Sequence, residues 1–174
     1  MRGSIDSGSL RQVLRYIPTS LAVVATMDGP QPLGCTVGSF VTVSLEPPLV
    51  AYFAMRSSKT LRAVRRQRTF SVNILAEDQA DLADLFARPS VNRSRDVPWW
   101  RLASGRPRLG DALVVVDCDL ERTRTIGDHT MVLGRVTGAT VRRPGVEPLV
   151  FAQGRFRGLA RDHMVDPGAD ARLA

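Results

Sequence analysis

Serines, a lysine and a threonine stand together in the stretch RSSKTLRAV, which begins at residue 56. The stretch predicts a helix capped by Ser57 or Ser58, with Leu61 and Val64 pointing inward. A helix N-terminus carries free backbone N–H groups and partial positive charge, so hydroxyls and a lysine there favour phosphate binding. An ordinary capped and solvated helix start is the alternative interpretation.

The chain has two histidines, His129 and His163. His129 follows Gly127 and Asp128 in TIGDHTMVLGRV (125–136), and Gly-Asp before strand-like residues is a hairpin signal. The sequence therefore predicts His129 at the mouth of a hairpin. Its imidazole changes charge near neutral pH and can donate a hydrogen bond to a ligand carboxamide, whereas the alternative is a surface turn residue.

Hydroxyl side chains alternate with apolar ones in GCTVGSFVTVS (34–44). A row of this kind on a strand can face a polar heterocycle. Serine and threonine are also ordinary residues of an edge strand, so this segment by itself leaves both interpretations open.

Other chemistry has little support in the sequence. Cys35 and Cys118 are far apart, in no C-x-x-C arrangement, and no histidine pair has ligand spacing, so we expect no metal site. The G-x-G-x-x-G, Walker A, G-x-S-x-G and H-E-x-x-H patterns are absent. A Rossmann domain and a serine hydrolase are therefore both disfavoured.

The charge of the chain is strongly basic, with 24 basic and 17 acidic residues and a net charge of +7. All the basic residues except Lys59 are arginines, and they are scattered along the chain. This pattern indicates a general compositional bias toward arginine rather than a phosphate-binding face. Aromatic residues make up 6% of the chain, too few for a stacking groove, so we expect no nucleic-acid partner. No apolar run reaches the ~20 residues of a membrane helix and no secretory signal is visible, so we expect a cytoplasmic protein without membrane contact.

The length of 174 residues predicts one domain, 1–174, with a core at about 10–160 and a flexible tail at 162–174. Stretch 88–111 lacks periodicity and is expected to be a long loop. Helices are expected at 7–18, 57–67 and 76–87, and strands at 21–27, 33–55 (two strands, with Pro47 and Pro48 either between them or at an edge), 69–75, 112–126, 129–142 and 148–159. Many strands with few helices predict an antiparallel barrel or sandwich with helical decoration.

Two of these helices have a predicted orientation. In helix 7–18, Ser7 or Ser9 is the expected cap, and an apolar stripe is formed by Leu10, Val13, Leu14 and Ile17. In helix 76–87, one apolar face is formed by Leu82, Leu85 and Phe86.

Taken in chain order, five segments resemble the flavin reductase-like family, which has the FMN-binding split-barrel fold. They are GCTVGSFVTVSLEPPLV, RSSKT, FSVNILAEDQADLADLFA, GDHTMVLGRV and PLVFAQGRFRGL. The resemblance extends from about residue 10 to 160. It implies a mainly β protein, a six-stranded antiparallel split β-barrel with a few flanking helices, usually a homodimer, that holds FMN or FAD at one rim.

The resemblance also implies roles for individual residues. His129 would face the nicotinamide of NADH or NADPH, whose C4 passes a hydride to flavin N5, and Phe156 would border the flavin ring. The isoalloxazine would be lined by Thr36, Ser39, Phe40, Val41 and Thr42, and the flavin phosphate would be held by Ser57, Ser58, Lys59 and Thr60.

The implied function is an NAD(P)H:flavin oxidoreductase that supplies reduced flavin to a partner monooxygenase. One alternative is a flavoprotein whose tightly bound flavin acts on another substrate. Another is a non-catalytic flavin-binding module.

Two features depart from the family pattern. Gly38 stands where relatives often carry serine, so one hydroxyl contact is expected to be missing. The loop after the third helix reads ARPSVNRSRDVPWW instead of a Gly-Gly-Asp-Lys-Phe-like sequence. The residues expected to substitute there are Arg93, Arg95, Trp99 or Trp100, or else the second substrate differs.

Overall fold

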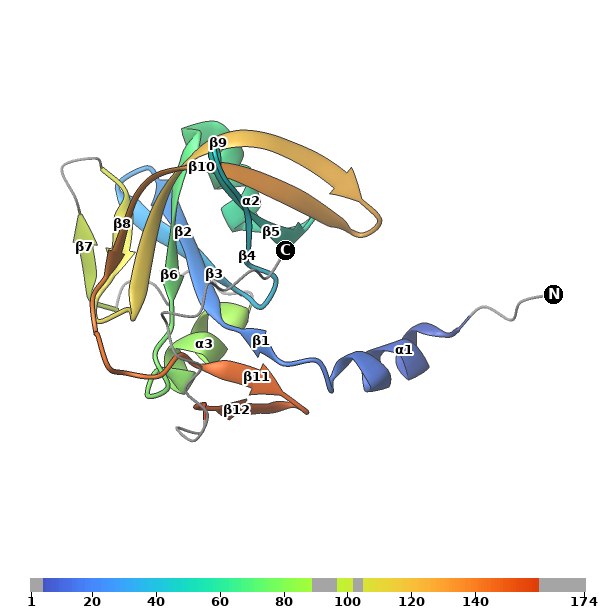
Figure 1. The fold of residues 1–174 in the computed structure, drawn as a ribbon. Helices are drawn as coiled ribbons and strands as arrows, with labels where there is room; N and C mark the ends of the chain where they lie inside the picture. Colours follow the sequence, from blue (N-terminus) through green and yellow to red (C-terminus); the bar gives the residue numbers. More distant parts are fainter. Residues whose placement is uncertain (1–4, 89–96, 102–104, 160–174) are drawn as a thin grey trace.

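Seven antiparallel strands form the main sheet of this protein, which a computed structural model describes over residues 5–88, 97–101 and 105–159. The strand order is β3-β2-β6-β9-β10-β5-β4 (Figure 1). The strands are β2 (Ala22–Asp28), β3 (Gln31–Val37), β4 (Val41–Leu45), β5 (Pro48–Met55), β6 (Thr69–Ile74), β9 (Val114–Ile126) and β10 (His129–Val141). Three hairpins, β2–β3, β4–β5 and β9–β10, supply six of these strands. Strand β6 then joins β2 to β9, and β5 pairs with β10.

The prediction of a mainly β protein with a few helices is confirmed, whereas the predicted six-stranded barrel is wrong, because the main sheet has seven strands in an open order. Segment 33–55 holds parts of three strands instead of two, because residues 38–40 belong to no strand and separate β3 from β4 along the chain. There the Ser39 hydroxyl bonds to both backbone groups of Phe53 and replaces ladder hydrogen bonds. The result is a seven-stranded order with β3 and β4 at its two edges. Pro47 lies between the two strands and Pro48 is the first residue of β5, so the prolines mark this strand boundary.

Apolar side chains from the main sheet form a core cluster. Tyr52 and Phe70 are fully buried and meet edge to face, with ring centroids 5.6 Å apart. Helix α2 (Lys59–Gln67) adds Leu61 and Val64 to the same cluster, as the sequence predicted, and Ser58 is its cap. Burying side chains of this size contributes roughly 1.5–3 kcal/mol each, so the helix is fixed firmly against the sheet.

Helix α3 (Ala80–Ala87) is shorter than the predicted 76–87. The side chain of Gln79 accepts a hydrogen bond from Ala76 N at 3.0 Å and donates one to Asp111 O at 3.0 Å, which holds the preceding residues in a turn. The buried residues of the helix are Ala83 and Phe86, whereas Leu82 and Leu85 are half-buried, so the predicted face is only partly correct.

The last predicted strand, 148–159, is a hairpin of two short strands, β11 (Val150–Ala152) and β12 (Arg155–Arg157). Gln153 and Gly154 both have positive φ, 54° and 75°, as a two-residue type I′ hairpin turn requires. Strand β11 also pairs with β1 (Thr19–Ser20), which makes a separate three-stranded sheet.

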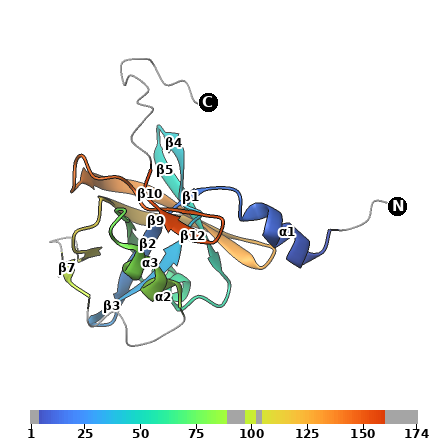
Figure 2. The same cartoon turned by 90° about the horizontal axis from the view of Figure 1, so that it is seen from below.

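Helix α1 (Ser7–Leu14) projects away from both sheets (Figures 1 and 2). Its cap is Asp6, whose carboxylate accepts hydrogen bonds from Gly8 N and Ser9 N, so the predicted caps Ser7 and Ser9 are wrong. The helix is shorter than the predicted 7–18, so Ile17 lies beyond it and the apolar stripe is formed by Leu10, Val13 and Leu14. None of these side chains is buried within this chain: Val13, for example, is 62% exposed. In the described part of the chain, no helix is long and apolar enough to cross a membrane. The tail at 162–174 lies outside the described residues.

The expected loop 88–111 contains a hairpin of β7 (Trp99–Arg101) and β8 (Pro107–Leu109). Trp99 packs edge to face against Phe86 of α3, with ring centroids 5.6 Å apart, whereas Trp100 is largely exposed. Arg93 and Arg95, the other expected substitutes in this loop, lie outside the described residues.

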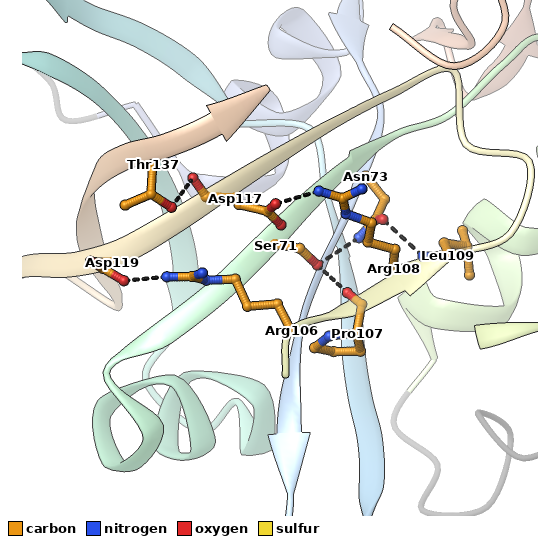
Figure 3. Close-up of polar contacts among 9 residues, drawn as sticks. All are labelled: Ser71, Asn73, Arg106, Pro107, Arg108, Leu109, Asp117, Asp119 and Thr137. Atoms are coloured by element: carbon orange, nitrogen blue, oxygen red, sulfur yellow. Dashed lines mark hydrogen bonds and ion pairs between the residues drawn. The ribbon is translucent and has the colours of Figure 1, made fainter. Parts of the chain in front are cut away.

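Side chains rather than a backbone ladder hold β8 against the main sheet (Figure 3). Leu109 N donates to Asn73 Oδ1 at 2.9 Å, and the Ser71 hydroxyl donates to Pro107 O. Arg108 forms an ion pair with Asp117, whose side chain is only 8% exposed. A second ion pair joins Arg106 to Asp119. Because Asp117 is buried, its pair with Arg108 is the contact most sensitive to the loss of one partner.

We expect Asp117→Ala to lower the free energy of unfolding by about 3 kcal/mol, because it leaves the Arg108 guanidinium largely buried without its partner. Asp84→Ala is the matched control, since Asp84 pairs with Arg88 on the exposed surface of α3. That loss should stay below about 0.5 kcal/mol. Urea denaturation of both variants measures the difference, and equal losses would contradict the importance of the Arg108–Asp117 contact.

Candidate functional site

The N-terminus of α2 presents the groups that an anion needs. Ser58 N donates to Met55 O at 2.9 Å, and the Ser58 hydroxyl accepts from Leu61 N at 3.2 Å, which fixes the first turn. Lys59 is exposed at the first helical position, and no acidic residue lies in that turn. Helix start, lysine and hydroxyls therefore lie together, and their chemistry fits a phosphate group.

Cys35 of β3 lies beneath this helix start. Burial raises the pKa of the Cys35 thiol, and hydrogen bonds with the hydroxyls of Thr60 and Ser58 partly oppose that shift. Thr60 itself is buried. The contact therefore joins the predicted phosphate segment to the strand that leads into the predicted ring-binding segment.

The hydroxyls of the predicted ring-binding segment already have partners inside the protein. The Thr36 hydroxyl donates to Ala83 O of α3 at 2.8 Å. The Ser39 hydroxyl donates its only hydrogen to Phe53 O at 3.1 Å and accepts from Phe53 N at 3.0 Å. Contacts from this segment to a flat ring would accordingly use the backbone and exposed side chains such as Val41, more than these two hydroxyls.

The remaining residues of the segment differ in burial. Phe40 packs against the main core, and Thr42 is exposed on β4, where it is paired with Val50 of β5. The glycine at position 38 is explained by packing against Thr19. A Cβ there would lie 2.8 Å from the Thr19 hydroxyl oxygen, so the serine expected from the family pattern would require Thr19 to move.

His129 begins β10 directly after the hairpin turn, as predicted, and is paired with Met55, the last residue of β5. The next residue along, Arg56, donates its N–H to Asp128 O at 3.3 Å. The G-D-H turn therefore lies beside the start of the R-S-S-K-T segment, although all elements from α2 to β9 separate them in sequence.

The structure thus gathers three predicted segments around one end of β5. Ser39 is bonded to Phe53, His129 is paired with Met55, and the phosphate segment 57–60 follows directly. Phe156 is not part of this group, because it lies on β12 in the other sheet and packs against Phe151.

Sequence reasoning treated Asp128 only as a turn residue and missed its side chain. Asp128 Oδ1 lies 2.7 Å from His129 Nδ1, and this hydrogen bond holds the pKa of the Asp128 carboxyl below its ordinary value. The available signal was the acidic residue directly before a histidine in a tight turn.

Residues 14–160 match the family described as "Flavin reductase like domain". This protein belongs to that family. The reductase subunit HsaB of a flavin-dependent monooxygenase from Rhodococcus jostii (strain RHA1) is 33% identical over 93% of this chain and 83% of the relative. The actinorhodin polyketide dimerase of Streptomyces coelicolor (strain ATCC BAA-471 / A3(2) / M145) is 35% identical over 96% and 94%.

Among solved structures, this chain is similar to the NADH:FAD oxidoreductase SgcE6 of Streptomyces globisporus C-1027 in complex with NAD and FAD fragments. The TM-score is 0.84 and the identity 36%, with 90% of this chain and 94% of that chain covered. The family resemblance inferred from the five segments is thereby confirmed.

Two substitutions at Ser58 separate its structural role from phosphate binding. Ser58→Ala should lower the free energy of unfolding by about 1 kcal/mol, because the cap of α2 is lost, and should also weaken flavin binding. Ser58→Asp keeps an equally good cap and so should retain wild-type stability, while its negative charge repels a phosphate. Urea denaturation and flavin fluorescence titration measure the two effects. Undiminished flavin affinity in Ser58→Asp would exclude the start of α2 from the phosphate site.

Proposed function

We propose that this protein is an NAD(P)H:flavin oxidoreductase that uses the end of β5 as its active site. The observation that carries the proposal is the meeting of the α2 N-terminus with the G-D-H turn, in a chain that belongs to the flavin reductase-like family. A site for a phosphorylated flavin and a residue able to contact a nicotinamide thus lie side by side.

The residues at this site have distinct tasks in the proposal. Segment 57–60 holds the flavin phosphate, with Lys59 supplying charge and the helix start supplying N–H groups. Thr36, Ser39, Phe40, Val41 and Thr42 line the isoalloxazine edge, and His129 orients the nicotinamide. The bound flavin, FMN or FAD, supplies the redox chemistry by accepting a hydride from NADH or NADPH. Positioning two flat rings against each other is therefore the main contribution of the chain.

We propose further that the reduced flavin is delivered to a partner monooxygenase and that the chain works as a cytoplasmic homodimer. The name of the Rhodococcus jostii relative, a monooxygenase reductase subunit, supports the partner. The exposed apolar stripe of α1 supports the dimer, because a helix of eight residues is marginal in water unless its apolar face packs against something. Residues 1–174 act as one functional domain in this proposal.

A second candidate is a flavoprotein whose tightly bound flavin acts on a different substrate. The observation that favours it is the similarity to a protein named polyketide dimerase over almost the whole chain. In that case the flavin should remain with the protein during gel filtration and oxidise NADH only slowly when free flavin is added.

The test is NADH and NADPH oxidation by purified, flavin-stripped protein with FMN, FAD or neither added. Turnover that rises and saturates with added flavin is the expected result, and it ranks both flavins and both donors. Tight flavin binding without such turnover would favour the second candidate, and absence of flavin binding would overturn both.

Lys59→Ala should weaken flavin binding by about 1 to 3 kcal/mol if Lys59 makes a charge-assisted hydrogen bond to the phosphate. Arg66→Ala is the matched control, because it removes the same charge from the last turn of the same helix, where Arg66 pairs with Asp28 on the surface. Fluorescence titration with FMN measures both dissociation constants. Equal values for the two variants would remove Lys59 from the site.

A further inference from the structure

We propose that Asp128 is a positioning residue that holds the His129 imidazole with Nδ1 protonated and Nε2 presented to the nicotinamide. This inference rests on the proposed function, in which His129 contacts the nicotinamide. Its own basis is the hydrogen bond of 2.7 Å between Asp128 Oδ1 and His129 Nδ1.

The chemistry of the pair determines which ring nitrogen carries the proton. An ionised carboxylate can only accept hydrogen bonds, so Nδ1 has to donate. The Asp128 carboxyl is exposed and so is ionised at neutral pH, and its hydrogen bond to His129 holds its pKa further below neutrality. The neutral ring is therefore the Nδ1–H form, with a lone pair on Nε2. A nicotinamide carboxamide offers N–H groups that such a lone pair accepts.

The surroundings of the ring suit this role. His129 is directly opposite Met55 on one side and Ile126 on the other, so these three side chains lie on the same face of the sheet. Met55 and Ile126 are both exposed apolar residues, and the His129 side chain is 41% exposed. An imidazole edge flanked by exposed apolar groups is a suitable contact for a flat, partly polar ring.

The backbone of the turn is anchored without the Asp128 side chain. Asp128 O accepts the Arg56 N–H, and His129 remains in the β5–β10 ladder. A substitution at position 128 therefore removes the carboxylate but keeps both the Arg56 N–H hydrogen bond to the backbone and the pairing of His129 with Met55. The simpler view, that Asp128 is only a solvated turn residue, is consistent with the 89% exposure of its side chain and is what the experiment has to exclude.

The experiment compares Asp128→Ala and Asp128→Asn with the wild-type protein. Asparagine keeps an oxygen that accepts from Nδ1–H, whereas alanine does not. Asp28→Ala is the matched control, because it removes an exposed carboxylate from the β2–β3 hairpin, away from the proposed site. Only two histidines are present, so ¹⁵N NMR of the imidazoles is simple, and a His163→Gln variant assigns the signals.

Wild-type His129, at a pH where the ring is neutral, should show the Nδ1–H form, as should Asp128→Asn. Asp128→Ala should shift toward the Nε2–H form that free histidine prefers. The KM for NADH should rise on the order of 3- to 10-fold in Asp128→Ala and stay near wild type in Asp128→Asn and Asp28→Ala. The flavin dissociation constant should not change in any of them.

A wild-type ring in the Nε2–H form, or an unchanged KM in Asp128→Ala, would overturn the proposal. Failure of the proposed function has a different signature. Wild-type protein that oxidises no NADH with any flavin would exclude the role toward the nicotinamide, while the NMR form of the ring would still decide whether Asp128 orients His129.

Discussion

The antiparallel pairing of β5 with both β4 and β10 is the constraint on which the candidate site depends. Pairing of β5 with β4 brings the segment around Ser39 to Phe53 of β5. Pairing of β5 with β10 brings His129 to Met55 of β5. The chain then turns directly into the start of α2. Residues that are far apart in the sequence therefore meet because one strand has hydrogen-bonded neighbours on both edges and a helix at its end.

Packing beneath this strand makes the arrangement rigid. Tyr52 of β5 is buried against Phe70, and α2 is anchored by Leu61 and Val64, so the helix start cannot move independently of the strand before it. Lys59 and Val41 are exposed near this core, and His129 is half-buried. A rigid apolar layer that supports a few exposed polar groups is the usual way in which proteins orient a flat ligand.

Local signals in the sequence predicted the parts of the fold that local chemistry determines. The cap at Ser58, the inward Leu61 and the strand boundary at Pro47 and Pro48 are short-range features, and all are confirmed. The break at residues 38–40 was missed because it depends on Ser39 bonding to Phe53, a contact between separate strands. The hairpin turn at Gln153 was missed because glutamine rarely adopts positive φ.

The candidate site was predictable to a similar degree. Residue types and the family resemblance identified the segments, but they did not show that the hydroxyls of Thr36 and Ser39 are already used inside the protein, or that Asp128 contacts His129. Side-chain partners of this kind depend on register and rotamer, which residue patterns do not encode.

The central claim is that flavin and nicotinamide meet at the end of β5. Anaerobic rapid mixing of NADH with the flavin-loaded protein tests it most directly, through the loss of the yellow flavin absorbance in a single turnover. The account predicts rapid loss that slows when deuterium replaces the transferred hydrogen of NADH, and a rate in His129→Ala that needs more NADH to reach half its maximum. Bound flavin whose absorbance does not change on mixing, or a His129→Ala variant indistinguishable from wild type at every NADH concentration, would contradict it.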